Sequence, residues 1–152
     1  MVKFELPKKD PGTVYLRFKY RDMIERFHAK FQLQKTELEK IDRFTQYGES
    51  LYEEGNIDGA VEALLMARDA APNNPRPYNN LGVLHWLIGD HETSVEYFAT
   101  ARRIDPNHRD TVWNCGQIMA DSKEYMMARH IYHQYMSENG YDEDMANELN
   151  GL

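Results

Sequence analysis

The sequence contains few of the residues that cross-links and metal cages require. Cysteine occurs once among 152 residues, as Cys115. A single cysteine excludes an intramolecular disulfide and a zinc site built from several thiolates. We therefore interpret Cys115 as a buried, inert thiol rather than a nucleophile. Such cysteine usage is typical of a reducing compartment, and we predict a cytoplasmic protein.

Long apolar runs are also missing. No stretch of the sequence approaches the length of a membrane span. Lys3, Glu5 and Lys8 are charged where a signal peptide needs an apolar core. We therefore expect a soluble chain with no direct membrane insertion.

The known local motifs of catalysis are absent too. The sequence contains no phosphate loop, no Gly-Xaa-Ser-Xaa-Gly elbow and no His-Glu-Xaa-Xaa-His. His130 and His133 could share one metal ion, but no carboxylate follows them at helical spacing, so no metal site is predicted. We predict a protein that is not an enzyme and needs no cofactor.

Basic residues are the minority charge, and they are unevenly distributed. The chain has 18 Lys and Arg against 25 Asp and Glu, a net charge of −7, which disfavours nucleic acid as a partner. Residues 1–40 hold ten basic and six acidic side chains, net +4, whereas residues 41–152 hold eight and nineteen, net −11. The two segments should attract each other.

The sequence repeats itself with a period of 34 residues. Windows 41–74, 75–108 and 109–142 align without gaps. Position 8 is always glycine, position 20 is small and position 24 is large: Gly48, Gly82, Gly116; Ala60, Ser94, Ala128; Leu64, Phe98, Tyr132. Small residues let two antiparallel helices approach closely, and the large ones fill the core between them. In the first two windows glycine at position 15 ends one helix and proline at position 32 stops the next.

This pattern resembles the tetratricopeptide repeat (TPR) family over 102 of the 152 residues. The resemblance implies an all-α fold, a right-handed solenoid of three helical hairpins. In the third window the pattern erodes, because Lys123 replaces the turn glycine, Tyr135 a small residue and Gly140 the proline. Erosion of this kind suits a terminal repeat.

We divide the chain into residues 1–40, 41–142 and 143–152. The first segment is a basic, aromatic arm followed by a capping helix over residues 23–34. Thr36 and Glu39 fit a capping box, which predicts that the first repeat helix starts near Glu37. The last segment is a short acidic helix with Met145 and Leu149 inward. Because this cap is small, we expect another chain to cover Met126, Tyr132 and Tyr135, or water to reach them in part.

The resemblance also implies a concave groove lined by the first helix of each repeat, with an aromatic centre and acidic ends. The predicted groove residues are Gln46, Glu49, Tyr52, Glu53, Arg76, Asn79, Asn80, Val83, Trp86, Leu87, Trp113, Asn114, Gln117 and Asp121, with Asp42, Thr45, Asp110 and Ala120 at the remaining groove positions. In some relatives asparagine at the places of Asn80 and Asn114 binds the backbone of an extended peptide, since an amide serves both N–H and C=O. The alternative is that asparagine is simply common there.

Heat-shock-chaperone co-factors of this family hold a C-terminal carboxylate through residues whose places here are taken by Thr45, Glu49, Asn80, Asp110 and Asn114. Only one of these five residues is of the type that the co-factors have there, and Asp110 is negatively charged where a carboxylate ligand needs a positive charge. A heat-shock tail is therefore not the expected ligand. The acidic ends favour a protein or peptide guest that combines apolar anchors with Lys or Arg.

One such guest lies within the chain. Residues 14–21 alternate apolar and basic side chains, which predicts an extended docking arm that includes Tyr15, Arg17, Phe18, Lys19, Tyr20 and Arg21. It could enter an acidic groove, of its own chain or of another copy in self-association, or it could pack on the outside of the first repeat. The preferred function is an adaptor or scaffold that binds an extended partner segment in the groove, within a larger assembly. The alternatives are a small TPR chaperone of a bacterial secretion system and an accessory subunit of an enzyme complex.

Overall fold

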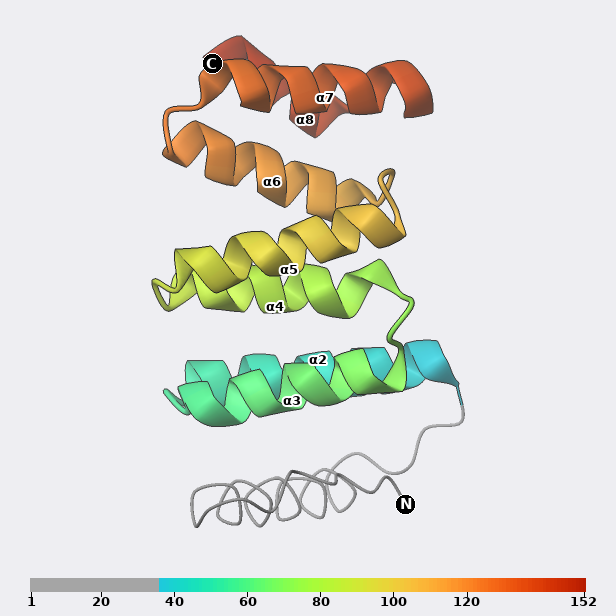
Figure 1. The fold of residues 1–152 in the computed structure, drawn as a ribbon, viewed down its shortest axis with the longest axis vertical. Coiled ribbons are helices and arrows are strands. Elements are labelled where there is room, and N and C mark those ends of the chain that lie inside the picture. Colours follow the sequence, from blue (N-terminus) through green and yellow to red (C-terminus); the bar gives the residue numbers. More distant parts are fainter. Residues whose placement is uncertain (1–35) are drawn as a thin grey trace. The chain divides into compact units, whose positions relative to one another are not determined.

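A computed structural model describes residues 36–152, and all seven elements in this part of the chain are α-helices (Figure 1). The chain divides into two compact units, of which the first ends at Ala71 and the second is Pro72–Leu152. The predicted capping helix at 23–34 and the docking arm at 14–21 lie outside the described residues. An all-α helical repeat fold, as predicted, is confirmed.

The first unit contributes one helical hairpin, α2 (Glu37–Glu53) and α3 (Ile57–Ala70). The Thr36 hydroxyl accepts a hydrogen bond from the backbone N–H of Glu39 at 3.1 Å, which confirms the predicted start at Glu37. Apolar residues of α2, Ile41 among them, pack against a stripe of alanines on α3. A Cβ added at Gly48 would lie 3.3 Å from the Ala60 carbonyl oxygen and from Leu64, so the two helices meet at the predicted glycine.

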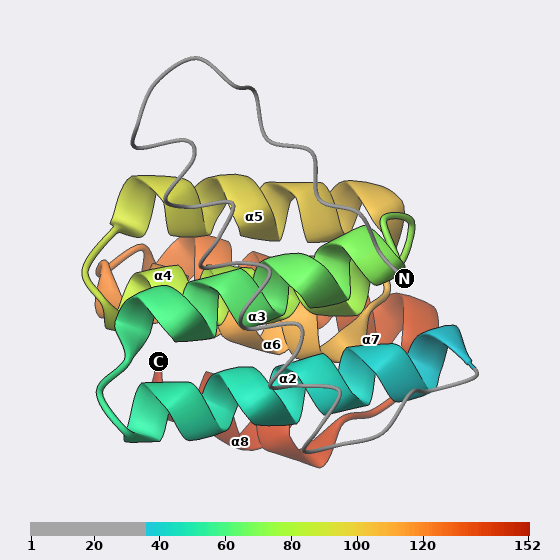
Figure 2. The same ribbon diagram turned by 90° about the horizontal axis from the view of Figure 1, so that it is seen from below.

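The second unit holds two further hairpins and a short last helix. Its helices are α4 (Pro75–Leu87), α5 (His91–Ile104), α6 (Arg109–Asp121), α7 (Tyr125–Asn139) and α8 (Glu143–Gly151). In Figures 1 and 2, α4 lies beside α5 and α6 beside α7. One hydrophobic cluster joins α5, α6, α7 and α8: Phe98, Val112, Cys115, Ile131, Tyr132 and Met145.

Helix α8 continues the 34-residue spacing. The helices α4, α6 and α8 begin at Pro75, Arg109 and Glu143. The third residue of each, Pro77, Thr111 and Met145, is fully buried. The acidic cap is therefore the first helix of a fourth repeat, shortened to nine residues.

This helix changes what the sequence predicted for the end of the array. Met145 is fully buried and Leu149 partly buried, both in the predicted inward direction. The expectation that water or another chain reaches Tyr132 is wrong, because Tyr132 is 0% exposed within the cluster that Met145 completes. Met126, in contrast, is 80% exposed, in line with the same expectation.

Large side chains pack directly against the position-8 glycines of α4 and α6. A Cβ added at Gly82 would lie 2.9 Å from the Phe98 ring, and one at Gly116 would overlap the Tyr132 ring. Beside the first contact, the buried Ser94 hydroxyl donates a hydrogen bond of 2.6 Å to the Gly82 carbonyl oxygen. A large side chain at repeat position 24 thus occupies the space that a side chain at position 8 would need.

Replacing these glycines should destabilise the protein, although alanine normally favours a helix. We expect Gly116→Ala to lower the free energy of unfolding by about 2 kcal/mol or more, and Gly82→Ala by about 1 kcal/mol, because overpacking displaces the opposing ring. Gly151→Ala is the matched control, since a Cβ there meets nothing within 4 Å, and it should be neutral or raise stability by up to about 1 kcal/mol. Urea unfolding followed by circular dichroism measures all three. Equal effects at Gly116 and Gly151 would contradict the packing argument.

The same backbone turn closes all three hairpins. Two hydrogen bonds define it: Gly55 N–H to Tyr52 O and Asn56 N–H to Leu51 O in the first hairpin, with counterparts at Gly89 and Lys123. This is the Schellman arrangement, which needs a left-handed residue after the helix. Gly55 and Gly89 have φ of 81° and 85°, and Lys123 adopts φ of 64° without being glycine. Loss of the glycine in the third repeat therefore leaves the turn in place at a cost in backbone strain.

That strain predicts a stabilising substitution. Lys123→Gly should raise the free energy of unfolding by about 1 kcal/mol. The left-handed conformation costs a non-glycine residue about 1–2 kcal/mol, and the greater conformational entropy of glycine in the unfolded chain offsets part of that gain. Lys123→Ala should bring no gain, since alanine keeps the strain and removes only the side chain. Thermal unfolding of the two variants beside the parent chain separates the backbone effect from the charge, and a gain in both would refute it.

Candidate partner-binding face of α4 and α6

The predicted groove residues fall on helices of both units. Those of the second and third repeats lie on α4 and α6 of the second unit, and Asp121, the last residue of α6, is exposed to solvent. Gln46, Glu49 and Glu53 are exposed on α2, and Tyr52 is half-buried there. A continuous groove across all three first helices stays a prediction, whereas the face of α4 and α6 (the α4–α6 face) can be described directly.

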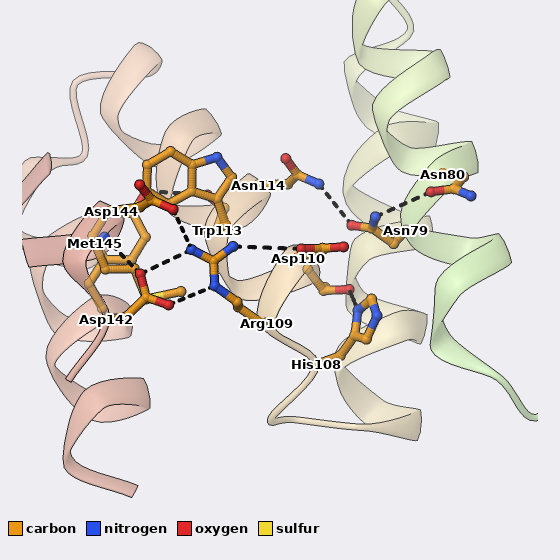
Figure 3. Close-up of polar contacts among 12 residues, drawn as sticks. Asn79, Asn80, His108, Arg109, Asp110, Trp113, Asn114, Asp142, Asp144 and Met145 are labelled. Atoms are coloured by element: carbon orange, nitrogen blue, oxygen red, sulfur yellow. Dashed lines mark hydrogen bonds and ion pairs between the residues drawn. The ribbon is translucent and has the colours of Figure 1, made fainter. Parts of the chain in front are cut away.

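Three asparagines connect the two helices of this face (Figure 3). The Asn114 side-chain amide donates to the Asn79 side-chain oxygen at 3.0 Å, and the Asn79 amide donates to the Asn80 oxygen at 3.4 Å. Asn79 is only 5% exposed, so this bond satisfies a buried polar group. The carbonyl oxygen of Asn114 points away from Asn79, where it can accept an N–H from a guest.

Both tryptophans of the predicted aromatic centre are half-buried and stacked on neighbours. Trp86 stacks on His91 with ring centroids 4.0 Å apart, and Trp113 stacks on Tyr132 at 5.8 Å. The Tyr132 hydroxyl donates to the Trp113 carbonyl oxygen and accepts from the Gln117 side chain, each at 3.2 Å. Burial raises the pKa of Tyr132 to about 12, so its hydroxyl stays a donor at neutral pH. Gln117 is thereby held by the core.

The exposed charges of this face are acidic, whereas the cation of α4, Arg76, is half-buried. Asp110 and Asp121 are exposed. Arg109 lies 3.8 Å from Asp110, but its guanidinium points to α8, where it donates to Asp142 at 2.6 and 3.0 Å and to Asp144 at 2.7 Å (Figure 3). The cation nearest to Asp110 is therefore committed to the end of the array.

Asp142 has two structural tasks at once. Its carboxylate accepts the Met145 backbone N–H at 3.1 Å, which caps α8, and it accepts the Arg109 guanidinium. The hydrogen bonds from Arg109 hold the pKa of the Asp142 carboxyl below its usual value. Sequence reasoning missed this pair, although the signal was present: a cation at the first position of the third repeat and an acid at its last.

Comparisons with known proteins support the repeat assignment. Residues 48–89 match the family model described as TPR repeat. The first TPR of Spaghetti (RPAP3), bound to the HSP90 peptide SRMEEVD, is similar to this chain with a TM-score of 0.62 at 16% identity, over 74% of this chain and 92% of that one. The chain carries a TPR repeat sequence and has the fold of TPR proteins. No curated protein matches its sequence.

Other TPR structures are longer than the part they share with this chain. The TPR2AB domain of yeast Sti1 in its pHSP90 complex has a TM-score of 0.61 at 15% identity, over 95% of this chain and 55% of that one. MamA from Desulfovibrio magneticus RS-1 has a TM-score of 0.58 at 19% identity, over 72% and 62%. Identities this low establish the TPR fold alone.

The other chemically active side chains of the described residues do not form a site. Cys115 is 8% exposed, and burial raises the pKa of its thiol to about 11, which agrees with an inert thiol. His130 and His133 are exposed, and no group of three or more metal-ligating side chains occurs in residues 36–152. His85 makes a hydrogen bond to Asp90 at 3.2 Å. Within the described residues no helix is long and apolar enough to cross a membrane.

One cavity opens between α5, α6 and α7 of the second unit. Its volume is about 30 Å³, and Arg102, Gln134 and Glu138 contribute polar atoms to its lining. The Nε atom of Arg102 is buried without a hydrogen-bond partner. A polar cavity of this size has room for one or two ordered water molecules, which would satisfy that donor.

The double role of Asp142 gives a prediction about pH. Asn caps a helix as well as Asp does, so Asp142→Asn should remove only the charge pair and cost about 1 kcal/mol, whereas Asp142→Ala should cost about 2 kcal/mol. Because the folded-state pKa is depressed, the stabilisation is complete above the unfolded pKa of about 4 and is lost as pH falls through the lower folded value. Urea unfolding between pH 7 and 3 should therefore bring the parent chain and Asp142→Asn together at the acid end. A gap that stays constant with pH would contradict the ion pair.

Proposed function

We propose that this chain is a non-catalytic interaction module whose α4–α6 face binds an extended partner segment. The supporting observation is the hydrogen bond between Asn114 and Asn79, which fixes an amide between neighbouring first helices with its oxygen directed away from Asn79. A guest backbone N–H can donate to that oxygen whatever its sequence. The half-buried Trp86 and Trp113 supply flat apolar surface on the same two helices.

The charge of the face indicates the chemistry of the guest. Asp110 and Asp121 are exposed on α6, whereas Arg76 is half-buried on α4 and Arg109 is bound to α8. Like charges across an interface are unfavourable, so an acidic tail is disfavoured and a segment with Lys or Arg beside apolar side chains is favoured. One structural relative is a complex with an HSP90 peptide and another is a pHSP90 complex. In such co-factors the residues at the places of Glu49 and Asp110 hold the carboxylate of the tail. Because both residues are acidic in this chain, we propose a different guest.

An adaptor or scaffold role follows from this mode of binding. The site recognises an extended backbone and a few side chains, and nothing in it reacts. Such a module connects its partner to whatever its other surfaces bind, and the reducing compartment that one buried thiol suggests is the cytoplasm.

The proposal predicts which of two peptides binds. Calorimetry of the full chain with SRMEEVD and with a peptide of alternating aromatic and lysine residues should detect binding of the second only. Asn114→Ala should weaken that binding about tenfold, the loss of one to two hydrogen bonds. Asn150→Ala is the control, because Asn150 is an exposed asparagine on α8. Tighter binding of SRMEEVD, or equal affinity of the two variants, would refute the proposal.

A further inference from the structure

Exposed large apolar side chains of the second unit gather at one end of it. The α4–α5 turn and the α6–α7 turn lie at the same end of this unit in both ribbon views (Figures 1 and 2). Six of the unit's exposed large hydrophobics lie at these turns or in the first residues of α5 and α7, and we call them the turn edge: Leu87, Ile88, Val95, Tyr125, Met126 and Met127. Met126 is 80% exposed and Leu87 58%. Apolar side chains gathered in this way mark an interaction surface more often than scattered ones do.

The repeat fold does not require apolar residues there. Met126 stands at repeat position 18, where the first two repeats have Asp58 and Glu92. Met127 stands where they have Gly59 and Thr93. The third repeat therefore exposes methionines at places that are polar or small in its neighbours, and methionine adapts its shape to varied partners.

The charges around the turn edge restrict what can cover it. The exposed charged residues of the two turns and the helix starts are mostly acidic: Asp90, Glu92, Glu96, Asp121 and Glu124, against Lys123 and Arg129. An acidic rim repels the same edge of a second copy and an anionic membrane surface. It favours a segment that combines apolar side chains with Lys and Arg.

We propose that the turn edge binds residues 14–21 of this chain, the docking arm. The arm alternates apolar and basic residues, with Arg17, Lys19 and Arg21 as its three cations, and it belongs to the segment of net charge +4. The turn edge suits the arm better than the α4–α6 face, because Trp86 and Trp113 are half-buried whereas Met126 is almost fully exposed. This second surface has its own occupant and does not rest on the proposed function.

A photo-cross-linking amino acid at position 126 of the full chain tests the proposal. After irradiation and digestion, mass spectrometry should find residues 14–21 as the main cross-linked peptide. The triple variant R17E/K19E/R21E should reduce that yield about tenfold, and so should high salt. The variant K3E/K8E/K9E reverses three other basic residues of the same segment and should leave the yield unchanged.

The cross-linker at Ser137 is the positional control, since Ser137 is exposed at the far end of α7. Mixing heavy- and light-isotope protein tells whether the arm comes from the same or from a second copy, and either supports the proposal. Three results would overturn it: cross-links between two turn edges, equal labelling of residues 14–21 from positions 126 and 137, or a yield that the triple charge reversal does not change. None of these outcomes depends on peptide binding at Asn114.

Discussion

The contact between a glycine and a large side chain across each hairpin is the constraint on which the rest of the second unit depends. At Gly82 and Gly116 no side chain can be added without displacing Phe98 or Tyr132. This contact sets how closely the two helices of a hairpin approach, and so where the first helices of successive repeats lie. The hydrogen bond between Asn114 and Asn79 joins two of these neighbouring first helices, and it forms only when the helices lie at this distance from each other.

The 34-residue period, and the helix arrangement that goes with it, continue to the last helix of the array. Helix α8 starts one period after α6, buries Met145 where α4 and α6 bury Pro77 and Thr111, and is attached by Arg109 through Asp142. The last hairpin is thereby covered by nine residues rather than by a full repeat. Charge pairing compensates in part for the apolar area that so short a helix can bury.

Much of the fold could be predicted from the sequence, because helix starts, turns and hairpins follow from short local patterns that recur every 34 residues. Glycine at position 15 predicts the turn, Thr36 predicts the start of α2, and small residues opposite large ones predict the hairpin. The structure adds that the turn survives at Lys123, where the same two backbone hydrogen bonds hold a left-handed lysine.

The side-chain contacts of the candidate site could not be predicted in this way. Arg109 and Asp142 are 33 residues apart, and Asn114 and Asn79 are 35 apart, so each pair meets only after the helices have packed. Burial of Tyr132 depends on α8, which seemed too short in sequence to cover it. Exposure of Met126 follows the eroded pattern of the third repeat, but its gathering with Leu87 depends on how the two turns lie in space.

The placement of the tryptophans has a practical consequence. The chain has two tryptophans, one on α4 and one on α6, both on the α4–α6 face. Intrinsic emission excited at the red edge of protein absorption therefore originates from this face alone. The Trp113 ring stacks on Tyr132, and the Tyr132 hydroxyl donates a hydrogen bond to the Trp113 carbonyl oxygen. A guest that shifts the Trp113 indole therefore changes the quenching of its fluorescence. The fluorescence of Trp86 depends in the same way on its stacking with His91. The fluorescence of the two tryptophans therefore reports on this binding surface without an attached label.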